Sequence, residues 1–189
     1  MSRTRLAAAT AACLLSLAVE AAPETYVLDP THTYPNFTVS HLGFSTMHGQ
    51  FAKTSGTLTL DRAAGSLKTS IEIDAASIYT GLAKRDDHLR SPDFFNVAEF
   101  PKLTFESSKS TWQGERPVSV TGELSLLGVK REVTLDITAF HCAEDPWKNY
   151  RCGADAVASI KRSEFGMSYG LPNIGDEIEL RFEIEGIRQ

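Results

Sequence analysis

The feature that most constrains the fold is a recurring alternation of apolar and polar residues. In residues 66–74 (SLKTSIEID) most odd positions are apolar and the even positions are polar. The same pattern returns in residues 103–106, 118–126, 132–139 and 177–185. A period of two places alternate side chains on opposite faces, which is typical of a strand with one buried face. The chain is therefore predicted to be all-β.

Turn residues separate these runs, including DRAAG at 61–65, Gln113-Gly114 and Leu127-Gly128. Such short connections join neighbouring antiparallel strands, and they indicate about eight to ten strands. The first are expected near residues 26–28, 36–41 and 50–60, and the last at 177–186. A sheet with one apolar face can close into a barrel or pack on a second sheet. The strand number favours the barrel, and a two-sheet sandwich is the alternative.

Residues 75–100 interrupt the strand pattern. Helix-forming residues run from Leu82 to Arg90, where Asp86 and Arg90 have the spacing of an ion pair. Pro92 disfavours helix at the preceding serine. This segment is predicted to be a short helical insert.

The first residues indicate export. Arg3 and Arg5 precede the apolar run 6–19, which is shorter than the roughly 20 residues that span a bilayer. Small residues at 19 and 21 predict a signal peptide at 1–21, and a first helix of the domain is the alternative. Residues 22–189 are then a single exported domain. No later apolar run is long enough to span a membrane, so an integral membrane protein is not expected.

Charge argues against a nucleic-acid partner. The chain has 19 Lys and Arg against 24 Asp and Glu. Removing residues 1–21 takes away two arginines and one glutamate, so the formal charge becomes −6. Nucleic acids require a clustered basic face, which this sequence lacks.

The cysteines Cys142 and Cys152 remain after the leader is removed. Because an exported protein meets an oxidising compartment, they are predicted to form a disulfide. Zinc binding is the alternative, but no histidine follows them at a finger-like spacing.

Catalytic and metal-binding motifs are missing from the sequence. The five histidines His32, His41, His48, His88 and His141 form no HExxH arrangement, and there is no G-x-S-x-G or glycine-rich phosphate loop. No catalytic residue, metal site or cofactor is predicted. Phenylalanines are concentrated in the N-terminal half, in the insert and near residue 165, where they could fill a core or line a cavity for an apolar ligand.

Four stretches of the sequence resemble the YceI family of exported, lipocalin-like proteins. They are LDPTHTYPNFTVSHLGFSTMHGQF (28–51), RDDHLRSPDFFNVAEFPKLTFES (85–107), GELSLLGVKREVTL (122–135) and IKRSEFGMSYG (160–170). The resemblance implies a lipocalin-like, antiparallel, eight-stranded barrel located in the bacterial periplasm. It also implies a hydrophobic pocket for an isoprenoid quinone, a polyprenyl phosphate or a related amphiphile.

The expected site follows from the resemblance and the alternation together. Residues expected to line the pocket are Phe37, Phe44, Phe51, Ile71, Ile73, Phe94, Phe95, Phe100, Leu103, Phe105, Leu124, Leu135, Ile160, Phe165, Met167, Leu180 and Phe182. Further inward aliphatic residues are Leu67, Leu126, Val133, Ile137 and Ile178. Residues expected at the rim or near a head group are His32, His41, Arg85, Asp86, His88 and Arg90. The competing interpretation of Arg85, Asp86 and Asp87 is that they only anchor the insert.

These expectations favour a non-enzymatic lipid-binding or carrier protein, with a hydrophobic ligand as partner and a homodimer left open. Three alternatives remain. The protein could scavenge toxic hydrophobic compounds, act on a lipid or quinone head group through His32, His41 or His88, or bind a metal through its histidines.

Overall fold

The computed structural model describes residues 22–189, so the predicted signal peptide lies outside the described residues. Eleven strand segments form one antiparallel sheet. They are β1 (Glu24–Leu28), β2 (Tyr34–His41), β3 (Ser45–Phe51), β4 (Thr54–Asp61), β5 (Ser66–Asp74), β6 (Ile78–Tyr79), β7 (Lys102–Gln113), β8 (Arg116–Leu126), β9 (Val129–Glu144), β10 (Tyr150–Lys161) and β11 (Ile174–Arg188). The short helices are η1 (Ala75–Ser77), α1 (Ala83–Arg90) and η2 (Arg162–Phe165).

The sheet closes on itself because β11 pairs with β10 along one edge and with both β1 and β2 along the other. Segments β1 and β2 thus act as one bent strand, and β3 and β4, which pair with them, act as another. With β5 and β7 to β11 they form a closed eight-stranded barrel. The predicted barrel is confirmed, and the sandwich alternative is wrong.

The strand predicted over residues 50–60 is broken where it meets the insert. The backbone N–H of Ala52 donates to the Ser77 carbonyl at 3.1 Å, and that of Lys53 donates to the Ser77 hydroxyl at 3.1 Å. These bonds replace ladder bonds between strands. The segments β3 and β4 are therefore separate.

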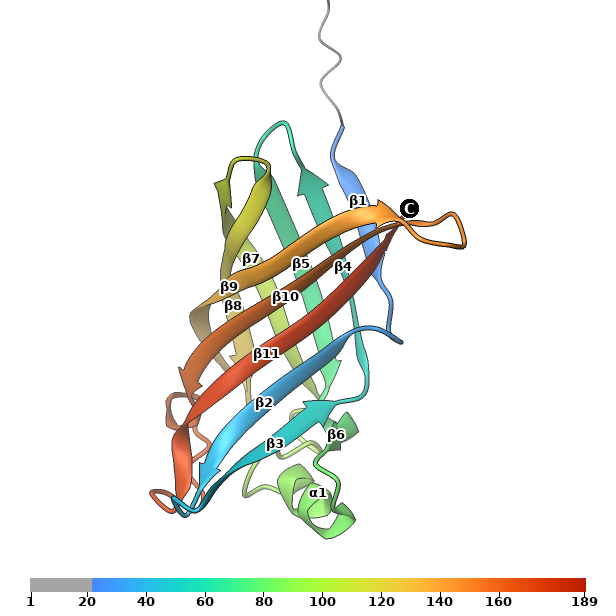
Figure 1. The fold of residues 1–189 in the computed structure, drawn as a ribbon. Helices are drawn as coiled ribbons and strands as arrows, with labels where there is room; N and C mark the ends of the chain where they lie inside the picture. Colours follow the sequence, from blue (N-terminus) through green and yellow to red (C-terminus); the bar gives the residue numbers. More distant parts are fainter. Residues whose placement is uncertain (1–21) are drawn as a thin grey trace, which may run out of the picture.

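The insert lies at one end of the barrel (Figure 1). The β2–β3 hairpin and the connection into β11 are at the same end, and the C-terminus is at the other. The predicted helix is confirmed as α1, but its expected Asp86–Arg90 ion pair is wrong. Arg90 pairs instead with Asp87 at 3.0 Å and donates to the carbonyls of Ala76 at 2.8 Å and Ile78 at 3.0 Å. Arg90 therefore anchors the helix to the segment before it.

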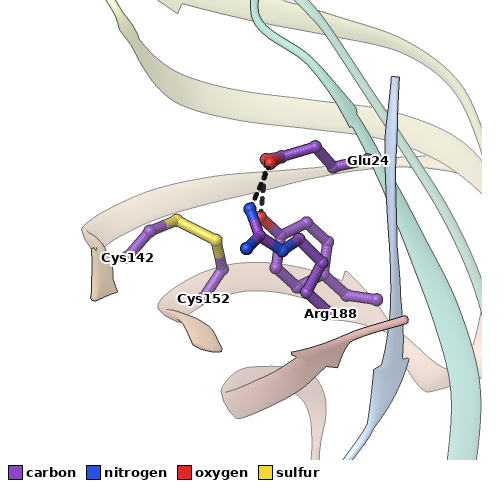
Figure 2. The surroundings of a disulfide bond; sticks show 5 residues. Glu24, Cys142, Cys152 and Arg188 are labelled. Atoms are coloured by element: carbon purple, nitrogen blue, oxygen red, sulfur yellow. Dashed lines mark hydrogen bonds and ion pairs between the residues drawn. A yellow bond between two sulfur atoms is a disulfide. The ribbon is translucent and has the colours of Figure 1, made fainter. Parts of the chain in front are cut away.

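The predicted disulfide between Cys142 and Cys152 is confirmed. The two residues lie directly opposite each other on β9 and β10. Figure 2 shows the disulfide in the same region as the ion pair between Glu24 and Arg188, whose Oε1 and Nη1 atoms are 2.7 Å apart. The disulfide joins two long strands near the end of the barrel where the chain terminates.

Candidate ligand-binding cavity

The two halves of the barrel interior differ. In the half near the termini, apolar side chains form a buried core, as Tyr26, Leu60 and Leu135 illustrate with exposures of 0 to 3%. In the half near the insert the interior is hollow, with a cavity of about 270 Å³. The barrel is therefore a packed core at one end and a cavity at the other.

Strand alternation places the cavity walls. On β2 the inward residues Phe37 and Val39 line the cavity, and on β11 the inward residues Ile178, Leu180 and Phe182 do so. Strands β5, β7, β8 and β10 each add aliphatic side chains. The walls are almost wholly apolar, which suits a hydrocarbon chain.

A row of aromatic rings connects the barrel wall to the insert. The ring centroid of Phe51 lies 6.1 Å from that of Phe37 and 5.4 Å from that of Phe95. Phe37 stands directly opposite Gly49 in the β2–β3 pair, and a Cβ at Gly49 would lie only 2.3 Å from Phe37 Cζ. The missing side chain at residue 49 therefore makes room for the Phe37 ring.

A second aromatic cluster joins the insert to the loop before β11. The rings of His88, Phe94 and Tyr169 have centroids 5.1 to 5.2 Å apart. The Nε2 atom of His88 also lies 2.8 Å from a carboxylate oxygen of Asp93. Since His88 and Phe94 line the cavity, this cluster forms part of its mouth.

Two arginines border the cavity. Arg85 is held by Thr80, donating from Nε to the hydroxyl and from Nη2 to the carbonyl, both at 2.7 Å. Arg162, only 3% exposed, donates to the backbone carbonyls of Met167, Ile174 and Gly175. Burial lowers the pKa of Arg162, while the Asp176 charge opposes that shift.

Most of the predicted lining residues do border the cavity. They are Phe37, Phe51, Ile73, Phe94, Phe95, Leu103, Leu124, Ile160, Met167, Leu180 and Phe182, together with the predicted rim residues His41, Arg85 and His88. Leu126 and Ile178, which were expected to face inward, also border it. Their contacts with a ligand stay predictions.

The other predicted lining residues lie elsewhere. Phe44 is 88% exposed because it follows the tight turn at Leu42 and Gly43, whose φ angles are 54° and 71°. Phe100 packs against the turn at Gly128, between β8 and β9. The remaining four are buried in the hydrophobic core without bordering the cavity: Ile71, Phe105, Leu135 and Phe165.

Three predicted rim residues have structural roles instead. Asp86, 4% exposed, accepts hydrogen bonds from the backbone N–H and the hydroxyl of Thr80. Arg90 anchors α1, as described above. His32 lies on the outer wall, where its Nδ1 is 2.9 Å from a carboxylate oxygen of Asp29. The contacts of Asp86 and Arg90 thus hold the insert in place, and neither residue borders the cavity.

The surroundings of His32 resemble a metal site but already contain a cation. Donor atoms of Asp29, His32 and Glu185 lie within 4.8 Å of one another. Arg151 Nη1 lies 2.6 Å from Asp29 and 3.2 Å from Glu185. Hydrogen bonds from Thr31, Arg151 and His32 hold the pKa of Asp29 well below its usual range. The cluster is an arginine–carboxylate network on the barrel wall.

Sequence reasoning missed several residues that border the cavity: Pro35, Asn36, Val39, Met47, His48, Thr80, Arg162 and Ile174. Alternation from Phe37 could have found Val39. No local signal marks Arg162, because its partners are carbonyls of the loop that follows it.

A closed antiparallel barrel with an apolar cavity at one end is an architecture that encloses one small apolar ligand. The chain belongs to the YceI-like family, whose domain model matches residues 26–186. It is 37% identical to proteins named "Protein YceI" from Salmonella arizonae and Salmonella dublin over 183 residues, with 95% of each chain covered. The recognised resemblance is confirmed.

Solved structures agree with this assignment. Burkholderia cenocepacia BcnA superposes with a TM-score of 0.72 at 25% identity, covering 84% of this chain and 98% of that chain. The Campylobacter jejuni YCEI protein gives a TM-score of 0.69 at 28% identity, covering 79% and 90%. A polyisoprenoid binding domain from Saccharophagus degradans gives 0.68 at 18% identity, covering 87% and 98%, which is a likeness of fold.

The helices of residues 22–189 include none that combines the length and the apolar character needed to cross a membrane.

Proposed function

We propose that this protein is a periplasmic binding or carrier protein that encloses the apolar chain of an isoprenoid amphiphile in the barrel. The observation that carries the proposal is the hollow, apolar half of a barrel whose other half is solidly packed. Empty apolar volume in a folded protein costs dispersion contacts. A cavity that the fold leaves open beside a packed core is best explained by a guest molecule.

The size of the cavity limits how much of the guest it encloses. Its volume of about 270 Å³ is close to the lower end of the range for small-molecule pockets. About ten buried methylene equivalents would contribute roughly 8 kcal/mol before ordering and association costs. A long polyprenyl chain would therefore be enclosed in part and would extend through the mouth or displace wall side chains.

Solvent extraction of the protein, purified from the periplasm without detergent, tests this proposal. Mass spectrometry of the extract should find an isoprenoid amphiphile in near-stoichiometric amount. The variant Leu180→Lys, which places a charge in the cavity wall, should carry much less. Phe44→Ser, which changes an exposed phenylalanine outside the cavity, is the matched control and should carry as much as the wild type. A wild-type extract with no lipid, combined with no uptake of added polyprenol or quinone, would contradict the proposal.

A further inference from the structure

The titratable side chains that border the cavity are all basic. They are Arg85, Arg162, His41, His48 and His88, and within residues 22–189 no aspartate or glutamate belongs to the lining. The whole chain has the opposite balance, with 24 acidic against 19 basic residues. By strand alternation the side chain of His48 belongs to the outward face of β3, whereas the two arginines approach the cavity from α1 and η2. Cationic groups around an apolar, low-dielectric space create a positive potential inside it.

Arg162 is a buried cation without a carboxylate partner. Its three hydrogen bonds, to the carbonyls of Gly175 at 2.8 Å, Ile174 at 2.9 Å and Met167 at 3.1 Å, use three of the five N–H groups of a guanidinium. Among the described residues, no carboxylate lies within ion-pair distance of it. The nearby Asp176 instead accepts hydrogen bonds from the backbone and hydroxyl of Ser163. A buried charge is costly unless it is paired, so Arg162 is suited to receive an anion.

Arg85 repeats this arrangement on the insert. Thr80 fixes its guanidinium through two hydrogen bonds, and within residues 22–189 no carboxylate forms an ion pair with it. The neighbouring Asp86 is turned to Thr80 instead. On the same helix, Arg90 does not border the cavity and does pair with an acid, Asp87. Among the described residues, neither of the two arginines that border the cavity has a protein counter-ion.

The basic residues all come from the end of the barrel that carries the insert. His41 ends β2, Arg85 and His88 lie on α1, and Arg162 begins η2, and these elements meet at one end (Figure 1). Acidic groups near them are engaged elsewhere, since Asp93 lies against His88 outside the lining. An amphiphile would therefore lie with its chain among the apolar walls and its head at the mouth.

We infer that the ligand carries an anionic head group, a phosphate or a carboxylate, which Arg162 and Arg85 bind at the mouth of the cavity. The inference rests on the proposed function and narrows it. It selects an anionic amphiphile, such as a polyprenyl phosphate, over a neutral quinone or alcohol with the same chain. Arginine suits this role because its N–H groups match the geometry of phosphate and carboxylate oxygens.

A matched pair of ligands tests the inference in the wild-type protein. Geranylgeranyl monophosphate and geranylgeraniol share one chain and differ in the charge of the head. Displacement of Nile red, a neutral fluorescent probe, below the concentration at which either ligand aggregates gives both dissociation constants. The phosphate is expected to bind at least about tenfold more tightly, the usual scale of charge-assisted hydrogen bonds. Equal affinities would overturn the inference and leave the proposed function standing, whereas no binding of either ligand would overturn both.

Inorganic phosphate separates a lipid head group from a free anion. At millimolar concentration it should displace neither the probe nor geranylgeranyl monophosphate. If inorganic phosphate bound as tightly as the lipid phosphate, the site would be one for a free anion, and the inference would fail.

Variants then test the two arginines. Arg85→Gln and Arg162→Met should each reduce the preference for phosphate severalfold while leaving the affinity for the alcohol nearly unchanged. Lys84→Gln removes the same charge from an exposed position of α1 outside the cavity, and it should keep the wild-type preference. If Arg162→Met does not fold, the inference is still tested by Arg85→Gln and by the ratio of the two dissociation constants in the wild-type protein. A folded Arg85→Gln protein with the full preference for phosphate would contradict the assignment.

Discussion

Replacing Gly49 by alanine should obstruct the cavity without unfolding the barrel. The new methyl group would lie 2.3 Å from Phe37 Cζ and 2.5 Å from Phe37 Cε1, whereas ordinary contact begins near 3.4 Å. The ring must therefore retreat by about 1.1 Å, the difference between 3.4 and 2.3 Å. Because Gly49 lies opposite Phe37 on the neighbouring strand, the ring is pushed away from the strand and toward the empty space.

The free energies of this change can be bounded. Overpacking a well-filled core costs about 1 to 3 kcal/mol. The cost here should fall at or below the lower end of that range, because Phe37 is only half-buried and borders a cavity into which it can move. Ligand affinity should fall by about tenfold or more, since the displaced ring occupies part of a cavity of only about 270 Å³.

Binding of geranylgeranyl monophosphate and urea unfolding, measured on the same preparation, test this prediction. Gly153→Ala is the matched control, because a Cβ there would meet its nearest atom at an ordinary 3.6 Å and lies outside the cavity lining. It should change neither quantity appreciably. Wild-type affinity in a folded Gly49→Ala protein would refute the role given to the Phe37 ring.

Three further predictions concern stability. Reducing the Cys142–Cys152 disulfide should lower the free energy of unfolding by roughly 3 kcal/mol, as judged by urea unfolding with and without reductant, and an unchanged midpoint would contradict it. The pKa of Asp29 is depressed in the folded state, so its ionised carboxylate adds to the free energy of unfolding. This contribution should be fully present above the ordinary pKa of 3.8 and should be lost as the pH falls below that value. Unfolding measured at pH 5 and pH 3 checks this, and greater stability at pH 3 would refute it. Leu135→Ala, in the packed half, should cost about 2 to 5 kcal/mol in the same assay, and a cost below 1 kcal/mol would mean that this half is not tightly packed.

The fold was predictable because alternation determines which face each strand residue occupies. Residues 177–185 were expected to place Ile178, Leu180 and Phe182 inward, and these residues do border the cavity. The break between β3 and β4 was not predictable, since it depends on Ser77, which lies more than twenty residues later in the chain.

The division of the barrel interior into core and cavity also could not be predicted from the sequence. Leu135 and Leu180 have the same alternating surroundings, yet one lies in the packed half and the other in the cavity wall. Alternation identifies a face, but packing along the barrel axis depends on every strand at once. Phe44 shows the related error of inferring a location from hydrophobicity alone, because the turn before it directs its ring to solvent.

A crystal structure of the protein with geranylgeranyl monophosphate tests the central claim most directly. The hydrocarbon chain should lie between Phe37 and Leu180 in the hollow half of the barrel, with the phosphate at the mouth beside Arg162. A chain bound on the outer surface, with the cavity still empty, would contradict the account.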